Sequence, residues 1–81
     1  PQNDIFYSEK ASIEIRVNLI DDAIATANEA IRFAPDHSDG YLFLGVAQCL
    51  KDQKAEGLKN LQKAGELGDP QAKELIEKYS K

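Results

Sequence analysis

Apolar residues recur every three or four positions along most of this chain, which is the spacing of one face of an α-helix. Five stretches follow the pattern, at about residues 4–17, 21–33, 39–51, 54–67 and 70–79. Short polar or turn-forming segments separate them, and Gly68 is well placed as a left-handed helix stop. Ile13 and Ile15 also fit a short alternating strand. The pattern predicts an all-α chain of five helices that pack as antiparallel neighbours.

The third stretch is apolar on nearly every side, unlike the other four. Its apolar residues are Tyr41, Leu42, Phe43, Leu44, Val46, Ala47, Cys49 and Leu50. A helix with this composition is buried on several sides, or else it exposes apolar surface. We expect Ser38 or Asp39 to cap its N-terminus, because short polar side chains satisfy the free amide groups there.

Residues of similar size recur at one fixed spacing along the chain. The interval of 34 residues from Tyr7 to Tyr41 also separates Ala11 from Gly45, Ala23 from Gly57, Ala27 from Leu61 and Ala30 from Ala64. We call this spacing the repeat interval. It falls well within the range of about 20–50 residues that is typical of repeat architectures. We therefore expect two helix-turn-helix units, at about 4–37 and 38–71, followed by a capping helix at about 70–80, within a single domain 1–81.

The spacing also predicts a core that is rich in small residues, which let neighbouring helices approach closely. Its expected members are Tyr7, Ala11, Ala23, Ile24, Ala27, Ala30, Ile31, Tyr41, Leu44, Gly45, Leu58, Leu61, Ala64, Leu75 and Ile76. A domain of 81 residues buries only about 60% of its unfolded surface and is only marginally stable.

The chain contains no Met and begins at Pro1, so we expect a processed protein or a piece of a longer one. The sequence leaves its compartment undetermined; a cytoplasmic location is slightly favoured, and an exported or periplasmic one stays open. No apolar run approaches the ~20 residues that a membrane span needs, so we expect no membrane insertion.

The net charge of −4 comes from the first part of the chain. Residues 1–37 carry seven acids and three bases, whereas residues 38–81 carry seven of each. An acidic domain is a poor partner for nucleic acid, which needs a basic surface. A lysine row at Lys51, Lys54, Lys59 and Lys63 is interleaved with acids, so we interpret it as an ordinary solvated helix face.

The candidates for chemistry are few. Cys49 and His37 are the only residues of their kinds, and about three helical turns are expected to separate them. One Cys and one His do not make a four-ligand metal site. Asp21 and Asp22 fit the first turn of a helix better than a catalytic pair. We therefore predict no enzyme activity, no metal and no cofactor.

The repeat pattern resembles the tetratricopeptide repeat family, over nearly the whole chain. The second unit keeps the large residue, the Leu-Gly pair and the later bulky and small positions as Tyr41, Leu44, Gly45, Leu61 and Ala64. It departs from the family at Gln48, where an aromatic is usual, and at Gly57, where Ala is usual. The first unit keeps Tyr7, Ala11, Ala23, Ala30 and Pro35, but it has Lys10 for the Leu and Ala27 for the bulky residue. The ending at 64–72 has one extra residue before Pro70 and is similar to the related Sel1-like repeats.

This resemblance implies a right-handed α-α superhelix of helical hairpins that binds proteins or peptides in a concave groove. The groove would be mostly apolar and lined by Ile5, Ser8, Ser12, Ile15, Leu42, Val46 and Cys49. The Lys and Asn side chains with which the family grips a peptide carboxylate are replaced by Ser8, Ser12, Leu42 and Val46. We expect an apolar segment of a protein or peptide as the partner. The alternative is a structural fragment that self-associates, for instance as a homodimer.

Overall fold

The chain folds into five α-helices, and the computed structural model describes residues 3–81, with side chains from Ile5 onward. The helices are α1 (Asn3–Arg16), α2 (Ile20–Phe33), α3 (Ser38–Leu50), α4 (Lys54–Glu66) and α5 (Ala72–Tyr79). Residues 3–81 contain no strand, and Ile13 and Ile15 are helical. The all-α prediction is therefore confirmed, with every predicted boundary within about two residues of the observed one.

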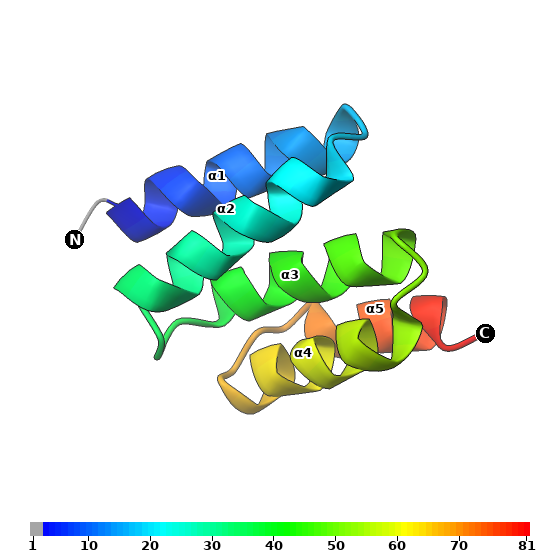
Figure 1. Ribbon diagram of the computed structural model, residues 1–81. Helices are drawn as coiled ribbons and strands as arrows, with labels where there is room; N and C mark the ends of the chain where they lie inside the picture. Colours follow the sequence, from blue (N-terminus) through cyan, green and yellow to red (C-terminus); the bar gives the residue numbers. More distant parts are fainter. Residues whose placement is uncertain (1–2) are drawn as a thin grey trace.

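Successive helices lie side by side (Figure 1). The helices α1 and α2 form one antiparallel hairpin, α3 and α4 form a second, and α2 packs against α3 between them. The last helix, α5, packs on α4 and also touches α3. The helix α1 also contacts α3, although less extensively than it contacts α2. The molecule is flattened and measures 35 × 26 × 16 Å.

Three helices end in the same way, with one residue in the left-handed conformation. These residues are Asn18 after α1, Asp52 after α3 and Gly68 after α4, with φ of 64°, 67° and 99°. In each case the next amide donates to the carbonyl five residues earlier, as Asp69 does to Ala64. Asn, Asp and Gly tolerate this conformation best, so the composition of the turns explains where the helices stop. The predicted stop at Gly68 is confirmed.

Small side chains dominate the core. Of the ten buried hydrophobic residues within 5–81, seven are alanine; the others are Leu42, Leu44 and Leu61, of which Leu61 has no exposed surface. Gly45 of α3 and Gly57 of α4 bring these two helices into close contact. A Cβ on Gly57 would lie 2.7 Å from the Gly45 carbonyl oxygen and 2.5 Å from the Cys49 Sγ. Close helix packing, rather than large side chains, therefore stabilises this fold.

The predicted core lies in the interior, although not all of it is fully buried. Its buried members are Ala11, Ala23, Ala27, Ala30, Leu44, Gly45, Leu61 and Ala64, and its half-buried members are Tyr7, Ile24, Ile31, Tyr41, Leu58, Leu75 and Ile76. The prediction missed three buried hydrophobic residues, Leu42, Ala47 and Ala72. Among the described residues, five pairs of positions separated by the repeat interval are buried at both members: 8 and 42, 11 and 45, 23 and 57, 27 and 61, 30 and 64.

The predicted cap of the third helix is wrong. Neither Ser38 nor Asp39 precedes α3; Ser38 is its first residue, and His37 occupies the cap position without a capping side-chain hydrogen bond. The Ser38 hydroxyl instead donates to the carboxylate of Asp69, which lies in the turn between α4 and α5. A tertiary contact has thus replaced the local one that the sequence favours.

Candidate functional site

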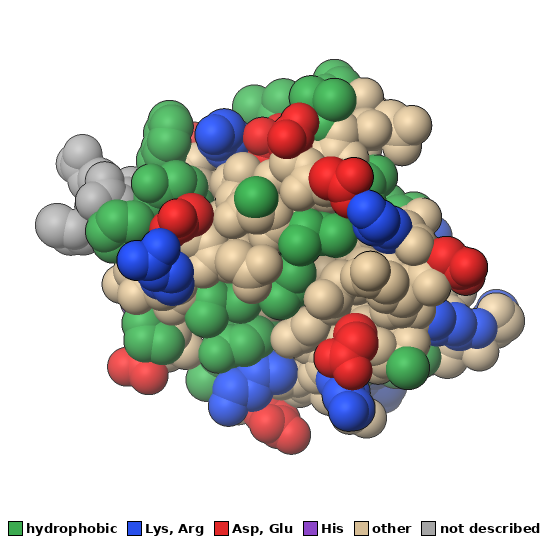
Figure 2. Space-filling model, in the orientation of Figure 1, with side chains coloured by type: hydrophobic (Ala, Val, Ile, Leu, Met, Phe, Trp, Pro, Cys, Tyr) green, Lys and Arg blue, Asp and Glu red, His purple; other side chains and the backbone are tan. Residues whose placement is uncertain are grey.

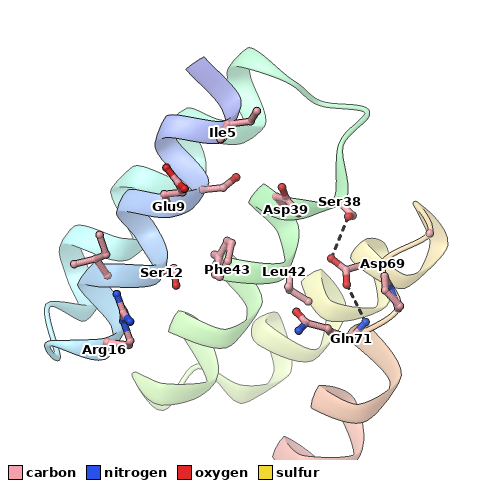
Figure 3. Close-up of a pocket in the computed structure, with 14 residues that line it drawn as sticks. Ile5, Glu9, Ser12, Arg16, Ser38, Asp39, Leu42, Phe43, Asp69 and Gln71 are labelled. Carbon is pink, nitrogen blue, oxygen red and sulfur yellow. Dashed lines mark hydrogen bonds between the residues drawn. The ribbon is translucent and has the colours of Figure 1, made fainter. Parts of the chain in front are cut away.

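A cleft of about 810 Å³ opens between α1, the first half of α3 and the turn from α4 to α5 (Figure 3). We call it the α1–α3 cleft. Its lining residues are Ile5, Ser8, Glu9, Ser12, Ile13, Arg16, Ser38, Asp39, Leu42, Phe43, Gly68, Asp69, Pro70 and Gln71. Cavities of this size are typical of sites that bind small molecules or short segments of chain.

The α1 side of the cleft is a single helical stripe. Ile5, Glu9, Ser12 and Arg16 follow one another at spacings of four, three and four residues. Residues at these spacings lie above one another on a helix surface. The stripe therefore runs along most of α1, with Ile5 at one end and Arg16 at the other (Figure 3).

The opposite side of the cleft is held in place by Asp69. Its Oδ2 accepts a hydrogen bond from the Ser38 hydroxyl at 3.1 Å, and its Oδ1 accepts one from the Gln71 amide at 2.9 Å (Figure 3). The first bond ties the turn to the start of α3, and the second shapes the turn itself before α5. Because both oxygens are engaged, Asp69 has a structural role in the cleft.

Leu42 and Phe43 supply the apolar part of the α3 side, and charged groups surround them. Three carboxylates line the cleft, on Glu9, Asp39 and Asp69, against the single guanidinium of Arg16. Within residues 5–81, neither Glu9 nor Asp39 has a hydrogen-bond or ion-pair partner. Acidic side chains therefore lie beside the apolar residues of the cleft, and the carboxylates outnumber the guanidinium.

The Ser8 hydroxyl is an unusual feature of the cleft wall. Ser8 lines the cleft, its exposed fraction is only 7%, and its Oγ has no hydrogen-bond partner among the described residues. A buried hydroxyl without a partner costs about 1–3 kcal/mol. Rotation about χ1 changes the direction of the hydroxyl at little cost, so a group in the cleft can become its partner.

The seven groove residues predicted from sequence fall into two groups. Ile5, Ser8, Ser12 and Leu42 line the cleft, whereas Ile15, Val46 and Cys49 are not among its lining residues. Val46 and Cys49 pack against the core cluster of Leu42, Leu61, Ala64 and Ala72, together with residues of α5. Val46 and Cys49 are therefore half-buried beside the core cluster and lie outside the cleft lining.

Sequence reasoning missed the charged lining of the cleft. Glu9 and Arg16 share the helical stripe of Ile5 and Ser12, so their spacing alone could have placed them there. Asp39 lies three residues before Leu42 on α3, so the same argument could have placed it beside that predicted groove residue. Asp69 and Gln71 could not have been placed in this way, because they reach the cleft through the packing of α4 and α5 on α3.

Cys49 and His37 lie far apart. His37 precedes α3 and Cys49 is its penultimate residue, so about 18 Å of helix separates them. Burial raises the pKa of the Cys49 thiol, an effect that the nearby Lys54 partly offsets. The thiol is therefore neutral at pH 7 and has little nucleophilic character.

Other kinds of site receive no support from the part of the chain that the structure describes. Residues 3–81 contain no group of three or more His, Cys, Asp or Glu side chains that is arranged to hold a metal ion. Among the same residues, every helix is too short or too polar to cross a membrane.

A second exposed apolar surface lies on the outer side of α1. Phe6, Ile13 and Val17 are 59%, 49% and 60% exposed and recur at spacings of seven and four residues. We call them the α1 outer stripe. Figure 2 shows hydrophobic side chains gathered along the edge of the molecule that α1 forms. Phe6 also contacts Tyr7 edge to face, and Tyr7 stacks on Phe33, with ring centroids 5.4 Å apart in both pairs.

Comparisons of this chain with protein-family models, with curated proteins and with solved structures give no match. Fold and site together define a class, an all-α protein of packed helical hairpins with a ligand-sized cleft on one face.

Proposed function

We propose that this chain is a non-catalytic interaction module that binds a peptide segment of another protein in the α1–α3 cleft. The observation that carries the proposal is the cleft itself, about 810 Å³ in volume and lined by three separate segments of the chain. Its apolar residues, Leu42 and Phe43 among them, provide contact area, and its polar ones can fix the orientation of a ligand.

The dimensions suit an extended peptide. The α1 stripe from Ile5 to Arg16 spans eleven residues of helix, or about 16 Å. An extended chain advances about 3.3 Å per residue, so the cleft accommodates roughly five residues. Serine side chains on the cleft wall can hydrogen-bond to the backbone of such a segment.

We further propose that the two hairpins are tetratricopeptide-like repeats and that α5 caps them. Burial at both members of five pairs separated by the repeat interval supports equivalent roles in the two hairpins. The left-handed residues that end α1 and α3, Asn18 and Asp52, are separated by the same interval. In repeats of this kind the first helices border the concave face, which agrees with a cleft between α1 and α3.

We also propose that the chain has no enzyme activity. This proposal is supported by the roughly 18 Å of helix between His37 and Cys49 and by a Cys49 pKa that burial raises. These are the only residues of their kinds, so a paired nucleophile and base would need another partner for each.

A random peptide library displayed on phage, selected on this chain, tests the proposal. We expect the selected peptides to shift the amide resonances of Ser12, Leu42, Gly68, Asp69 and Gln71 in ¹⁵N-labelled protein. Ser12→Trp should fill the cleft and abolish binding. Gln62→Trp, on an exposed position of α4 outside the cleft, is the matched control and should bind as the parent does. Peptides that shift only other regions, or that still bind the folded Ser12→Trp variant, would contradict the proposal.

The alternative is self-association through the α1 outer stripe. The specific observation in its favour is the exposure of Phe6, Ile13 and Val17 along one line. This surface lies mostly outside the cleft and only Ile13 belongs to both, so the two proposals can be tested separately.

A further inference from the structure

We propose that the segment bound in the α1–α3 cleft carries a lysine or arginine side chain, which lies between Glu9 and Asp39. This inference rests on the proposed peptide-binding function and names the chemistry of the ligand. It adds a basic side chain to the apolar segment that we expect from the sequence. Four features of the cleft support it: its charge balance, the free state of two carboxylates, the position of Arg16 and the Ser8 hydroxyl.

Charge complementarity is the first argument. Three carboxylates and one guanidinium line the cleft, and the whole chain has a net charge of −4. The Asp69 carboxylate accepts two hydrogen bonds within the fold, whereas Glu9 and Asp39 have no partner among the described residues. Glu9 comes from α1 and Asp39 from α3 (Figure 3). A cation between them would neutralise two charges that the fold leaves unpaired.

The position of Arg16 gives the site a direction. Arg16 lies seven residues after Glu9 on the same stripe, about 10 Å along the helix axis. A second cation at that end would be repelled. The bound segment should therefore have its basic residue at the Glu9 and Asp39 end, and a neutral or acidic residue about three positions away.

The Ser8 hydroxyl is the independent sign of a ligand. It is more than nine-tenths buried, it lines the cleft next to Glu9, and its Oγ has no partner among the described residues. Such groups are normally satisfied in a folded protein. A backbone amide or carbonyl of an extended segment can satisfy it once the hydroxyl rotates into the cleft. Leu42, Phe43 and Ile13 can then contact the aliphatic stem of the basic side chain and its apolar neighbours.

Three short peptides with blocked ends form the test. They share a frame of leucine and serine and differ at one central position, which is lysine, norleucine or glutamate. Their dissociation constants and binding sites come from amide shifts of the ¹⁵N-labelled chain. We expect the lysine peptide to bind in the cleft at least about fivefold more tightly than the norleucine peptide, and the glutamate peptide to bind most weakly.

Variants of the chain distinguish binding at Glu9 and Asp39 from a general attraction of the peptide to an acidic protein. Glu9→Gln with Asp39→Asn should reduce the lysine peptide to the affinity of the norleucine peptide. Glu74→Gln with Glu77→Gln removes the same charge from exposed positions of α5 outside the cleft and should change the affinity by less than about twofold. Arg16→Gln should tighten binding of the lysine peptide. Ser8→Ala should weaken the binding of all three peptides, because each peptide backbone would lose the Ser8 hydroxyl as a hydrogen-bond partner. If Ser8 has only a structural role, the affinities of the peptides should not change.

Each outcome bears on one proposal or the other. If the norleucine or glutamate peptide binds the cleft as tightly as the lysine peptide, the basic specificity is wrong and the peptide-binding function stands. If the α5 control variant weakens the lysine peptide as much as the cleft variant does, the attraction is diffuse and the inference fails. If none of the three peptides shifts the cleft amides, and the phage library also selects none that does, the proposed function fails and the inference fails with it.

Discussion

The close contact between α3 and α4 depends on two residues that have no side chain. Gly45 and Gly57 let α3 and α4 approach until a Cβ on Gly57 would lie 2.7 Å from a backbone oxygen and 2.5 Å from the Cys49 Sγ. Glycine within a helix costs about 1 kcal/mol relative to alanine. The sequence tolerates this cost at two facing positions because the contact leaves no room for a methyl group.

Gly57→Ala should therefore destabilise the protein although alanine is the better helix former. We expect a net loss of about 1–3 kcal/mol in the free energy of unfolding, because the clash involves backbone and cannot relax by rotation of a side chain. Urea unfolding followed by circular dichroism measures the change. Gly65→Ala in the same helix is the control: its Cβ would meet only the Ala72 Cβ, at 3.3 Å, so it should be neutral or stabilising by up to about 1 kcal/mol. A Gly57→Ala variant as stable as the parent would mean that α3 and α4 are further apart than described.

Among the elements, α5 depends most on a single side chain. It is the shortest helix, and the turn before it is held by the two hydrogen bonds of the Asp69 carboxylate, to Ser38 and to the Gln71 amide. These bonds connect the start of α3 to the start of α5, two places that are distant in the sequence.

Removal of the Asp69 side chain should loosen α5 selectively. We expect Asp69→Ala to reduce the free energy of unfolding by about 1–2 kcal/mol, since it leaves the Ser38 hydroxyl and the Gln71 amide without their acceptor. Hydrogen exchange should become faster in α5 and change little in α2. Asp69→Asn keeps an acceptor oxygen for the Gln71 amide and should lose less stability. Equal effects on α2 and α5 would show that the carboxylate does not act locally.

The sequence predicts the helices themselves but not the contacts between helices that are distant in the sequence. Helical spacing and the turn residues Asn18 and Gly68 are local signals, so they place the five helices correctly. The capping role expected for Ser38 is wrong because Asp69, distant in sequence, competes for its hydroxyl. Val46 and Cys49 were expected in an open groove, but they pack against the core cluster together with α5, whose position on α3 no local pattern encodes. The α1 side of the cleft was predictable and the α4–α5 side was not.

At the scale of the whole molecule, the exposed apolar residues of α1 decide how the chain behaves at high concentration. A stable dimer usually buries about 800 Å² on each partner. The α1 outer stripe consists of three half-exposed side chains, Phe6, Ile13 and Val17, which is less than such an interface needs. Exposed patches of this size occur on many monomeric proteins.

We therefore expect the chain to be monomeric at micromolar concentration and to self-associate only weakly, with a dissociation constant of about 100 µM or higher. Sedimentation equilibrium over a wide concentration range measures this constant. Phe6→Glu with Val17→Glu should abolish the association, whereas Leu50→Glu, on another exposed apolar residue, should not. A tight dimer at micromolar concentration would favour the self-association alternative over a monomeric binding module.

The helices contact mainly their neighbours in the sequence, and this order affects how the molecule unfolds. Because each helix rests mainly on its neighbours in the sequence, the two ends of the chain can unfold separately, and local folding should be fast. The cleft is the exception to this order, since Ile5 and Gln71 line it together although they lie near opposite ends of the chain. A ligand in the cleft would therefore contact both ends of the chain and link their stabilities. The two ends would then unfold together rather than separately, and hydrogen exchange would slow at both ends.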